Sequence, residues 1–439
     1  MLVENYIVAT NNLLKSSQTA TSKNEGVFIY ELQPESTLRT KFKNSSTSVN
    51  ALAANSTHIF AAQAEKAVVH VYSREKQAQE SIISFPARIY SLTLIGEGVL
   101  VLGTAEGRLI LWELSTGRSI STVAAHLQVV SCVAAKKSYL VSGSDDSNLH
   151  VWSTPQLLSL SENLSLEPIR SLSNHQAPIT SLVLGNSESN NDICVSASKE
   201  NTVLVWNYYS GQLLRTFLLS STPLCLSLDP CDRGVYVGLD DGSIQLIEFL
   251  GSYSNKNLIF DSALQATPFK VAAQQWNSPG DAGSALCICL TYDGTYLLTG
   301  HTSGKINQWD TGRRRFLSEV SSLTAPVTNL IFQSPFPINE RTRISTVVKP
   351  KLSSHEHVLT TQFIGSITSE FDHTVFSRGF STEMINDAIT RFTIPLHSSS
   401  EADEQLKNEN ESLWKVINEL RAVQKKTWEK YTTLQAGDT

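Results

Sequence analysis

The chain has 439 residues, of which 41% are hydrophobic, so it is long enough to bury a large core and lacks the composition of a disordered protein. Its 35 Lys and Arg against 41 Asp and Glu give a net charge of −6, which argues against a protein that coats nucleic acid or an anionic membrane. No apolar run approaches the roughly 18 residues of a membrane-spanning helix, and the start resembles no signal peptide. We therefore expect a soluble protein inside the cell.

A short β-branched run that ends in an aromatic residue recurs along the first three quarters of the chain. These runs end at Tyr30, Tyr72, Trp112, Trp152, Trp206 and Trp309, and Ile247 replaces the Trp in a further, degenerate repeat. The first four follow one another at about 40 residues, the period of a WD-repeat blade. The sequence predicts an all-β fold: a seven-bladed WD-repeat β-propeller with a C-terminal coiled-coil α-helix.

The two ends of the propeller, expected over residues 1–335, complement each other. The first repeat lacks an innermost strand on its N-terminal side, whereas residues 325–332, after the last repeat, have the pattern of one. We infer that strand 325–332 completes blade one and closes the ring, which would protect the sheet edges. Residues 336–400 are expected to form an extension of mixed loops and short strands.

One set of polar residues could be mistaken for an acid–base cluster: His126, Ser142, Asp146 and Trp152. His175 stands at the same offset in the next repeat, which favours a structural hydrogen-bond relay between strands, as found in WD-repeat proteins. The fragment 300–304 mimics a nucleophile elbow but recurs at equivalent hairpin turns. Because no phosphate-binding, dinucleotide-binding or zinc-protease motif occurs, we predict a non-enzymatic protein without cofactor or metal.

Three stretches exceed what a blade needs: 153–176, 250–282 and 336–400. The second contains Phe269 and Trp276, which could contact a partner or cap the propeller's own surface; the same stretch is expected to supply the outer strand of blade six. The basic triplet 313–315 is a small cluster, so direct RNA contact stays open.

From residue 400 the composition changes to Glu, Lys, Asn, Leu and Gln, with no Gly or Pro before Gly437, which predicts a helix over 401–434. A seven-residue spacing defines a dimerisation seam made of Leu406, Asn410, Leu413, Ile417, Leu420, Gln424 and Leu434. This spacing favours a homodimeric coiled coil over a helix that lies back along the propeller. Trp414 and Trp428 fall on one flank and could contact a further partner.

This plan, with the tail pattern Leu406-x6-Leu413-Trp414-x2-Ile417-x2-Leu420, resembles the WD-repeat subunit of the pre-60S Rix–Ipi complex, which is involved in processing of the second internal transcribed spacer of rRNA. The resemblance implies a scaffold of the nucleolus and nucleoplasm. It also implies, as partners, an armadillo-like scaffold subunit, a helical-repeat subunit, the pre-60S particle and a dynein-like AAA ATPase that the complex recruits. A role in DNA replication licensing has also been attached to the family.

Two other classes of function stay open. A propeller can serve as the adaptor of another assembly, such as a ubiquitin-ligase receptor or a trafficking coat, and co-purifying proteins would discriminate between these assemblies. An enzyme would need a polar pocket at the central channel, which the sequence does not reveal.

Overall fold

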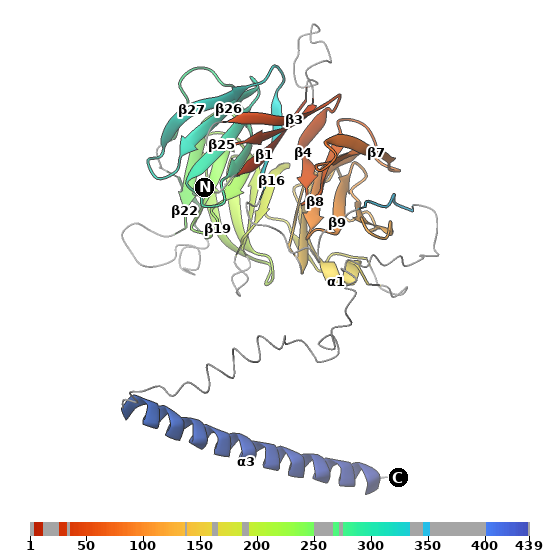
Figure 1. Cartoon of the computed structure of the whole chain (residues 1–439), viewed down its shortest axis with the longest axis vertical. Helices are drawn as coiled ribbons and strands as arrows, with labels where there is room; N and C mark the ends of the chain where they lie inside the picture. The colour runs from red at the N-terminus through yellow and green to blue at the C-terminus, as the bar shows by residue number, and fades with distance from the viewer. Residues whose placement is uncertain are drawn as a thin grey trace, which may run out of the picture. The chain divides into compact units, whose positions relative to one another are not determined.

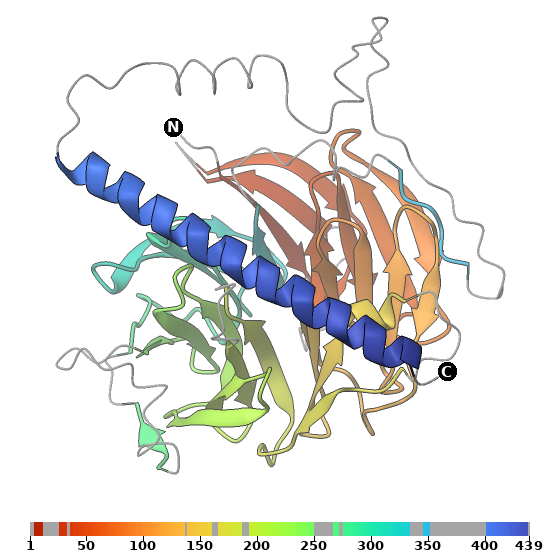
Figure 2. The same ribbon diagram turned by 90° about the horizontal axis from the view of Figure 1, so that it is seen from below.

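The computed structural model describes residues 4–11, 26–32, 36–136, 138–159, 166–186, 193–249, 267–271, 275–333, 346–351 and 401–437. The chain divides into two compact units, Met1–Ile364 and Gly365–Thr439. In the first unit seven sheets surround a central axis, as Figures 1 and 2 show. The predicted seven-bladed propeller is therefore confirmed.

Blades one to four each contain four strands, and each strand pairs antiparallel with the next one outward. Blade one is built from β28 (Val327–Phe332), β1 (Asn5–Thr10), β2 (Gly26–Glu31) and β3 (Thr37–Lys43), and blade two from β4 (Thr47–Ala54), β5 (His58–Gln63), β6 (Val68–Ser73) and β7 (Ala78–Ser84). Blade three holds β8 (Ile89–Ile95), β9 (Val99–Thr104), β10 (Leu109–Glu113) and β11 (Ser119–Ser121), and blade four β12 (Cys132–Ala135), β13 (Tyr139–Gly143), β14 (Leu149–Ser153) and β15 (Arg170–Leu172).

Blades five and six depart from this four-stranded pattern. Blade five consists of β16 (Ile179–Leu184), β17 (Ile193–Ser198), β18 (Thr202–Asn207), β19 (Gln212–Leu218) and the added β23 (Phe269–Lys270). The described part of blade six holds β20 (Pro223–Leu228), β21 (Gly234–Leu239) and β22 (Ile244–Glu248). Blade seven is regular, with β24 (Ala285–Leu290), β25 (Tyr296–His301), β26 (Lys305–Asp310) and β27 (Arg315–Ser322). A four-residue helix, α1 (Thr154–Leu157), follows β14.

The core lies between neighbouring blades, because every blade is apolar on both faces. One cluster joins Phe60 of blade two to Trp112 of blade three, with the two rings edge to face at a centroid distance of 6.0 Å. Trp112, Trp152, Trp206 and Trp309 are all fully buried. Each of these tryptophans lies in a separate inter-blade cluster, whereas the cluster between blades five and six has Ile247 at the equivalent position.

Blade one contains strands from both ends of the propeller sequence. Its innermost strand, β28, pairs antiparallel with β1, with Ile7 opposite Ile331 and Val8 opposite Leu330. Thr328 then links blade one to blade two, since its hydroxyl donates to the Thr47 carbonyl at 2.8 Å. The ring is therefore closed by the pairing of β28 with β1 and by the hydrogen bond from Thr328 to blade two.

Much of 250–282, which we expect to supply the outer strand of blade six, lies outside the described residues, and its described parts contact two blades. Strand β23 pairs parallel with β19 of blade five, where the Phe269 ring meets Phe217 edge to face at 6.1 Å. The contact with blade six is an isolated bridge between Trp276 and Ile244.

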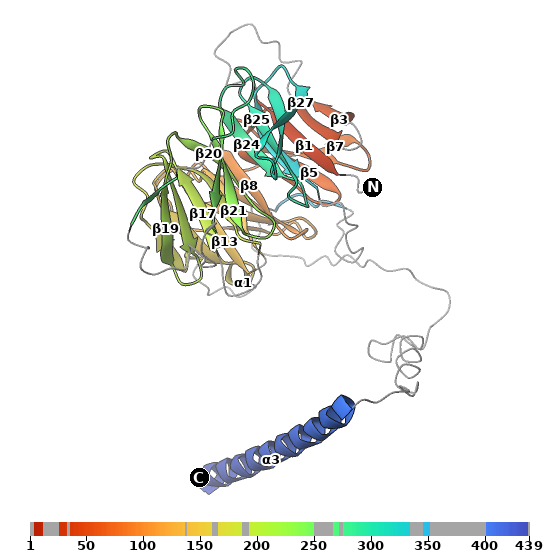
Figure 3. The same ribbon diagram turned by 90° about the vertical axis from the view of Figure 1, so that its left-hand side faces the viewer.

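The second unit contains one long helix, α3 (Glu401–Gly437), which Figure 3 shows along its length. The predicted C-terminal helix is therefore confirmed. Every side chain described within it, from Asn408 to Lys430, is exposed. No helix among the described residues has both the length and the apolar character needed to cross a membrane.

Candidate functional site

The polar set of blade four forms a continuous hydrogen-bonded chain. The Trp152 indole Nε1 donates to Ser142 Oγ at 2.9 Å, and Ser142 Oγ lies 2.8 Å from His126 Nε2. His126 Nδ1 lies 3.2 Å from Asp146 Oδ2, so it donates to the carboxylate and leaves Nε2 to accept from the hydroxyl. The chain runs across strands β14 and β13 to the loop before β12, and it ties the blade together.

Hydrogen bonds stabilise the negative charge of the Asp146 carboxylate. Burial alone would raise the pKa of this carboxyl, but hydrogen bonds from His126 and from the backbone amides of Asn148 and Leu127 outweigh burial and lower the pKa to about 2. The carboxylate therefore stays ionised at neutral pH and orients the imidazole.

The complete arrangement recurs in blade five, and its Trp–hydroxyl–His part recurs in blade seven, where His301 meets the Gly283 carbonyl in place of a carboxylate. In blade five Trp206 donates to Ser196 at 3.0 Å, Ser196 meets His175, and His175 meets Glu200 at 2.8 Å. In blade seven Trp309 donates to Thr299 at 2.9 Å, and Thr299 meets His301 at 2.9 Å. Repetition in three blades is what a structural relay requires.

The hydroxyl of this relay is poorly arranged for nucleophilic chemistry. Ser142 is fully buried, and its oxygen already bonds both the indole and the imidazole. A nucleophile must instead present its oxygen to a substrate. Among the described residues there is also no group of three or more His, Cys, Asp or Glu side chains that could hold a metal ion.

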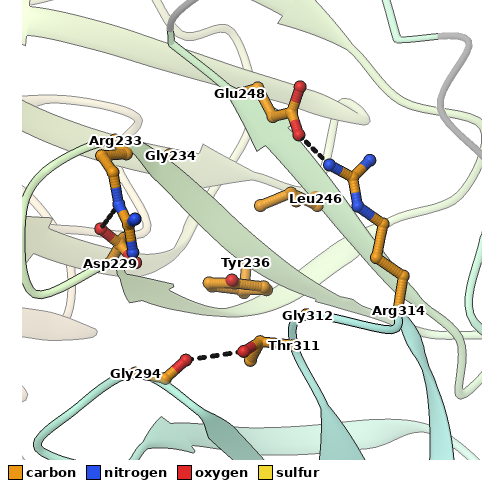
Figure 4. A pocket seen from close by; sticks show the side chains of 10 residues that line it. All are labelled: Asp229, Arg233, Gly234, Tyr236, Leu246, Glu248, Gly294, Thr311, Gly312 and Arg314. Atoms are coloured by element: carbon orange, nitrogen blue, oxygen red, sulfur yellow. Dashed lines mark hydrogen bonds and ion pairs between the residues drawn. The ribbon is translucent and has the colours of Figure 1, made fainter.

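A pocket of about 460 Å³ opens between blades six and seven (Figure 4). Arg233 bonds both oxygens of Asp229 at 2.8 and 2.9 Å on one wall, and Arg314 pairs with Glu248 on the other. Tyr236 lies between the two pairs in Figure 4. Because each guanidinium already has a carboxylate partner, these four groups present no net charge to a ligand.

The basic triplet noted in the sequence lies at the rim of this pocket. Arg314 pairs with Glu248, and Arg313 Nε lies 3.8 Å from Asp310 Oδ2. Two of the three guanidiniums are thus already paired with carboxylates, which weakens the case for RNA contact through this triplet.

The central channel is narrowed by a bulge that sequence reasoning missed. The pairing of β4 with β5 shifts register between Thr47 and Leu52, and Asn50 in the bulge has a positive φ of 59°. Asn50 Nδ2 donates to the carbonyls of Ser131 at 3.3 Å and Thr180 at 3.1 Å. Blade two is therefore bonded directly to blades four and five across the channel, whose remaining cavity is about 170 Å³.

The residues proposed as partner contacts have different environments. Trp276 is only 4% exposed and packs against Trp309 and Tyr236, so it caps the propeller and is not available as a contact surface. Phe269 is 54% exposed. On α3, Trp414 and Trp428 are 56% and 67% exposed.

The apolar seam residues described on α3 are open to solvent. Leu413, Ile417 and Leu420 are 59%, 40% and 63% exposed, and Asn410 and Gln424 are also exposed. Leu406 and Leu434 belong to the helix, but their side chains lie outside the described residues. The described part of the seam is thus an apolar surface whose exposure to water is unfavourable in free energy.

Comparison with known proteins agrees with this fold. The model of the family "WD domain, G-beta repeat" matches residues 117–153, 166–207 and 276–310. The chain is 24% identical over 364 residues to Pre-rRNA-processing protein IPI3 of Candida albicans, with 72% of each chain covered. It is 27% identical over 290 residues to WD repeat-containing protein 18 of Danio rerio, covering 65% of this chain and 64% of the relative. It is 25% identical over 318 residues to Pre-rRNA-processing protein crb3/ipi3 of Schizosaccharomyces pombe, covering 67% and 71%.

The sheets, the buried tryptophans and the relays define a WD-repeat β-propeller protein. Within that class the chain is similar to Pre-rRNA-processing protein IPI3 and to WD repeat-containing protein 18. The resemblance to the WD-repeat subunit of the Rix–Ipi complex is thereby confirmed. The chain spans about two thirds of the length of these relatives.

Proposed function

We propose that this protein is a non-enzymatic scaffold that acts in pre-rRNA processing during assembly of the large ribosomal subunit. The observation that carries the proposal is the similarity, over about two thirds of the chain, to relatives named for pre-rRNA processing. The geometry is compatible with it, because the relays use their polar groups to hold blades together and leave the loops and α3 as surfaces for partners.

The finer parts of the proposal follow from the family resemblance. The protein works in the nucleus, in the nucleolus and nucleoplasm, as part of a complex with an armadillo-like scaffold subunit and a helical-repeat subunit. On the pre-60S particle this complex supports removal of the second internal spacer and recruitment of the dynein-like AAA ATPase. A contribution to DNA replication licensing is included as a separate activity.

Depletion of the protein followed by pulse labelling of rRNA tests the central claim. We expect precursors that contain the second internal spacer to accumulate and mature large-subunit rRNA to fall, while small-subunit rRNA continues to mature. Normal maturation of large-subunit rRNA after depletion would contradict the proposal. Affinity purification then separates it from the adaptor alternative: ribosome-assembly factors co-purify with a scaffold of this kind, and ubiquitin-ligase or coat subunits with an adaptor.

We also propose that α3 pairs two copies of the chain. The exposure of Leu413, Ile417 and Leu420 supports this, because burial of such a stripe against an identical helix removes apolar surface from water. Light scattering at micromolar concentration should give a dimer mass for the full chain and a monomer mass for Ile417→Asp. The control is Asn418→Asp, which adds the same charge one residue away from the seam and should remain dimeric. A monomer mass for the unaltered chain would defeat this proposal.

A further inference from the structure

Blade three buries a tryptophan without the hydroxyl that its counterparts use. In blades four, five and seven the indole donates to a residue ten positions earlier, which is Ser142, Ser196 or Thr299. The equivalent position before Trp112 is Leu102, which is fully buried. The sheet of blade three therefore offers the Trp112 indole no such acceptor, and a buried donor needs one.

The missing acceptor comes from the segment beyond the propeller. Trp112 Nε1 donates to the carbonyl of Val348 at 3.0 Å. We call residues 346–351 the strap. Its backbone also pairs with the turn after β10: the Val348 amide donates to the Leu114 carbonyl at 2.8 Å, and the Lys351 amide to the Gly117 carbonyl at 2.9 Å.

The strap also fits blade three through side-chain packing. Val347 packs against the cluster that contains Phe85 and Trp112. Gly117 has φ +74°, and a Cβ there would lie 2.6 Å from the Lys349 carbonyl oxygen and 2.8 Å from Val348 Cγ1. A side chain at this position would therefore collide with the strap.

The matching glycine of blade five shows that this fit is specific to blade three. Gly211 stands five residues after Trp206, as Gly117 stands five residues after Trp112, and it has a similar φ of +78°. A Cβ at Gly211 would meet nothing closer than 3.3 Å. Both turns need a residue that tolerates positive φ, but only the turn of blade three also admits another segment.

We propose that blade three carries a binding groove for an extended segment, that its occupant is the strap of the same chain, and that this docking anchors the C-terminal extension to the propeller. The groove recognises backbone groups through Trp112, Leu114 and Gly117 and an apolar side chain through the contact with Val347. The ring closes in blade one, but the segment that leads to α3 departs from blade three.

The anchor shortens the tether between the propeller and α3. Without it the connecting segment would be 334–400, and with it the segment is 352–400.

Hydrogen exchange of the full-length protein tests the proposal with a matched pair of variants. The Val348 and Lys351 amides should be protected in the unaltered chain. In Gly117→Ala their exchange should accelerate by about tenfold or more, because the new methyl group displaces the strap and its hydrogen bonds are lost. Gly211→Ala carries the same cost of positive φ without the collision, so it should leave both amides protected.

A second variant isolates the indole donor. Trp112→Phe keeps an aromatic ring in the core but removes the hydrogen bond to Val348, so it should accelerate exchange at the strap more than at the strands of blade three. The proposal is overturned if the two amides are unprotected in the unaltered chain. It is equally overturned if Gly117→Ala and Gly211→Ala change them to the same extent.

Discussion

At the scale of single residues, the partner of each tryptophan indole determines how its blade is held together. Ser142, Ser196 and Thr299 accept the indole N–H within their own sheets, and each also meets a histidine. Blade three, with Leu102 at this position, depends on a carbonyl far along the chain. In these four blades the residue ten positions before the tryptophan thus determines whether the indole finds its acceptor within its own sheet.

The depressed pKa of Asp146 makes blade four sensitive to acid. The carboxyl has a folded pKa of about 2, below its ordinary value of 3.8, so its contribution to stability is complete above about pH 4 and is lost as the pH falls towards 2. Asp146→Asn should lower the free energy of unfolding by about 1–2 kcal/mol at pH 7. Urea denaturation from pH 7 to pH 3 should show this difference shrinking below pH 4.

The neighbouring acid supplies the control for that measurement. Burial raises the pKa of Asp145, and the nearby charges of Lys199 and Asp146 act in opposite directions. Its ionised form is therefore disfavoured in the folded state, and Asp145→Asn should not destabilise the protein at pH 7. Equal losses in the two variants would show that the relay does not stabilise the Asp146 charge.

Asn50 should act as a link across the central channel. Asn50→Gly retains access to positive φ but removes the two hydrogen bonds to blades four and five, so it should lower the free energy of unfolding by about 1–2 kcal/mol. Asn50→Ala adds the strain of a left-handed backbone, about 1 kcal/mol more. Chemical denaturation of both variants checks the order, and a loss in Asn50→Ala alone would show that the hydrogen bonds contribute nothing.

At the scale of elements, what repeats in the sequence could be predicted and what occurs once could not. The blades follow from strands that alternate apolar and polar residues and end in Trp112, Trp152, Trp206 or Trp309. The helix α3 follows from its composition and leucine spacing. The relay positions are visible as fixed offsets from each tryptophan.

The exceptions are local and leave little trace in the sequence. The bulge at Asn50 is a change of backbone register, which side-chain periodicity does not encode. Strand β23 pairs through two residues only, too few for any period. The strap is a single short segment without a repeat, although Leu102 in place of a hydroxyl is a signal that the Trp112 indole needs another acceptor.

The closing strand β28 should be required for a stable ring. A chain that ends after Gln333 retains the pairing of β28 with β1, and a chain that ends after Leu323 lacks it. Both lack the strap and α3, so they differ in the closing segment alone. We expect the longer chain to unfold cooperatively and the shorter one to melt at least about 10 °C lower or to aggregate, because the inner edge of β1 loses its partner strand. Thermal melts with equal midpoints would contradict this role of β28.

At the scale of the whole molecule, the proposed roles of the propeller and of α3 can be tested separately in cells. After depletion, Asn418→Asp should restore large-subunit rRNA maturation as the unaltered protein does, because its seam is intact. Ile417→Asp, with the same folded propeller, should restore it poorly if two copies are needed on the particle. Full rescue by Ile417→Asp would show that pairing through α3 is dispensable for this function.

The completion of blade one by β28 also has a consequence for biosynthesis. When β1 leaves the ribosome, the strand that will cover its inner edge has not been made, since more than 300 residues separate Ile7 from Ile331. The first blade must wait in an incomplete form while the other blades are translated, and a contact of such high sequence separation forms slowly. The nascent chain therefore has a long interval in which an unpaired edge is available to chaperones or to a wrong strand, and it becomes a sealed ring only when translation has passed residue 332.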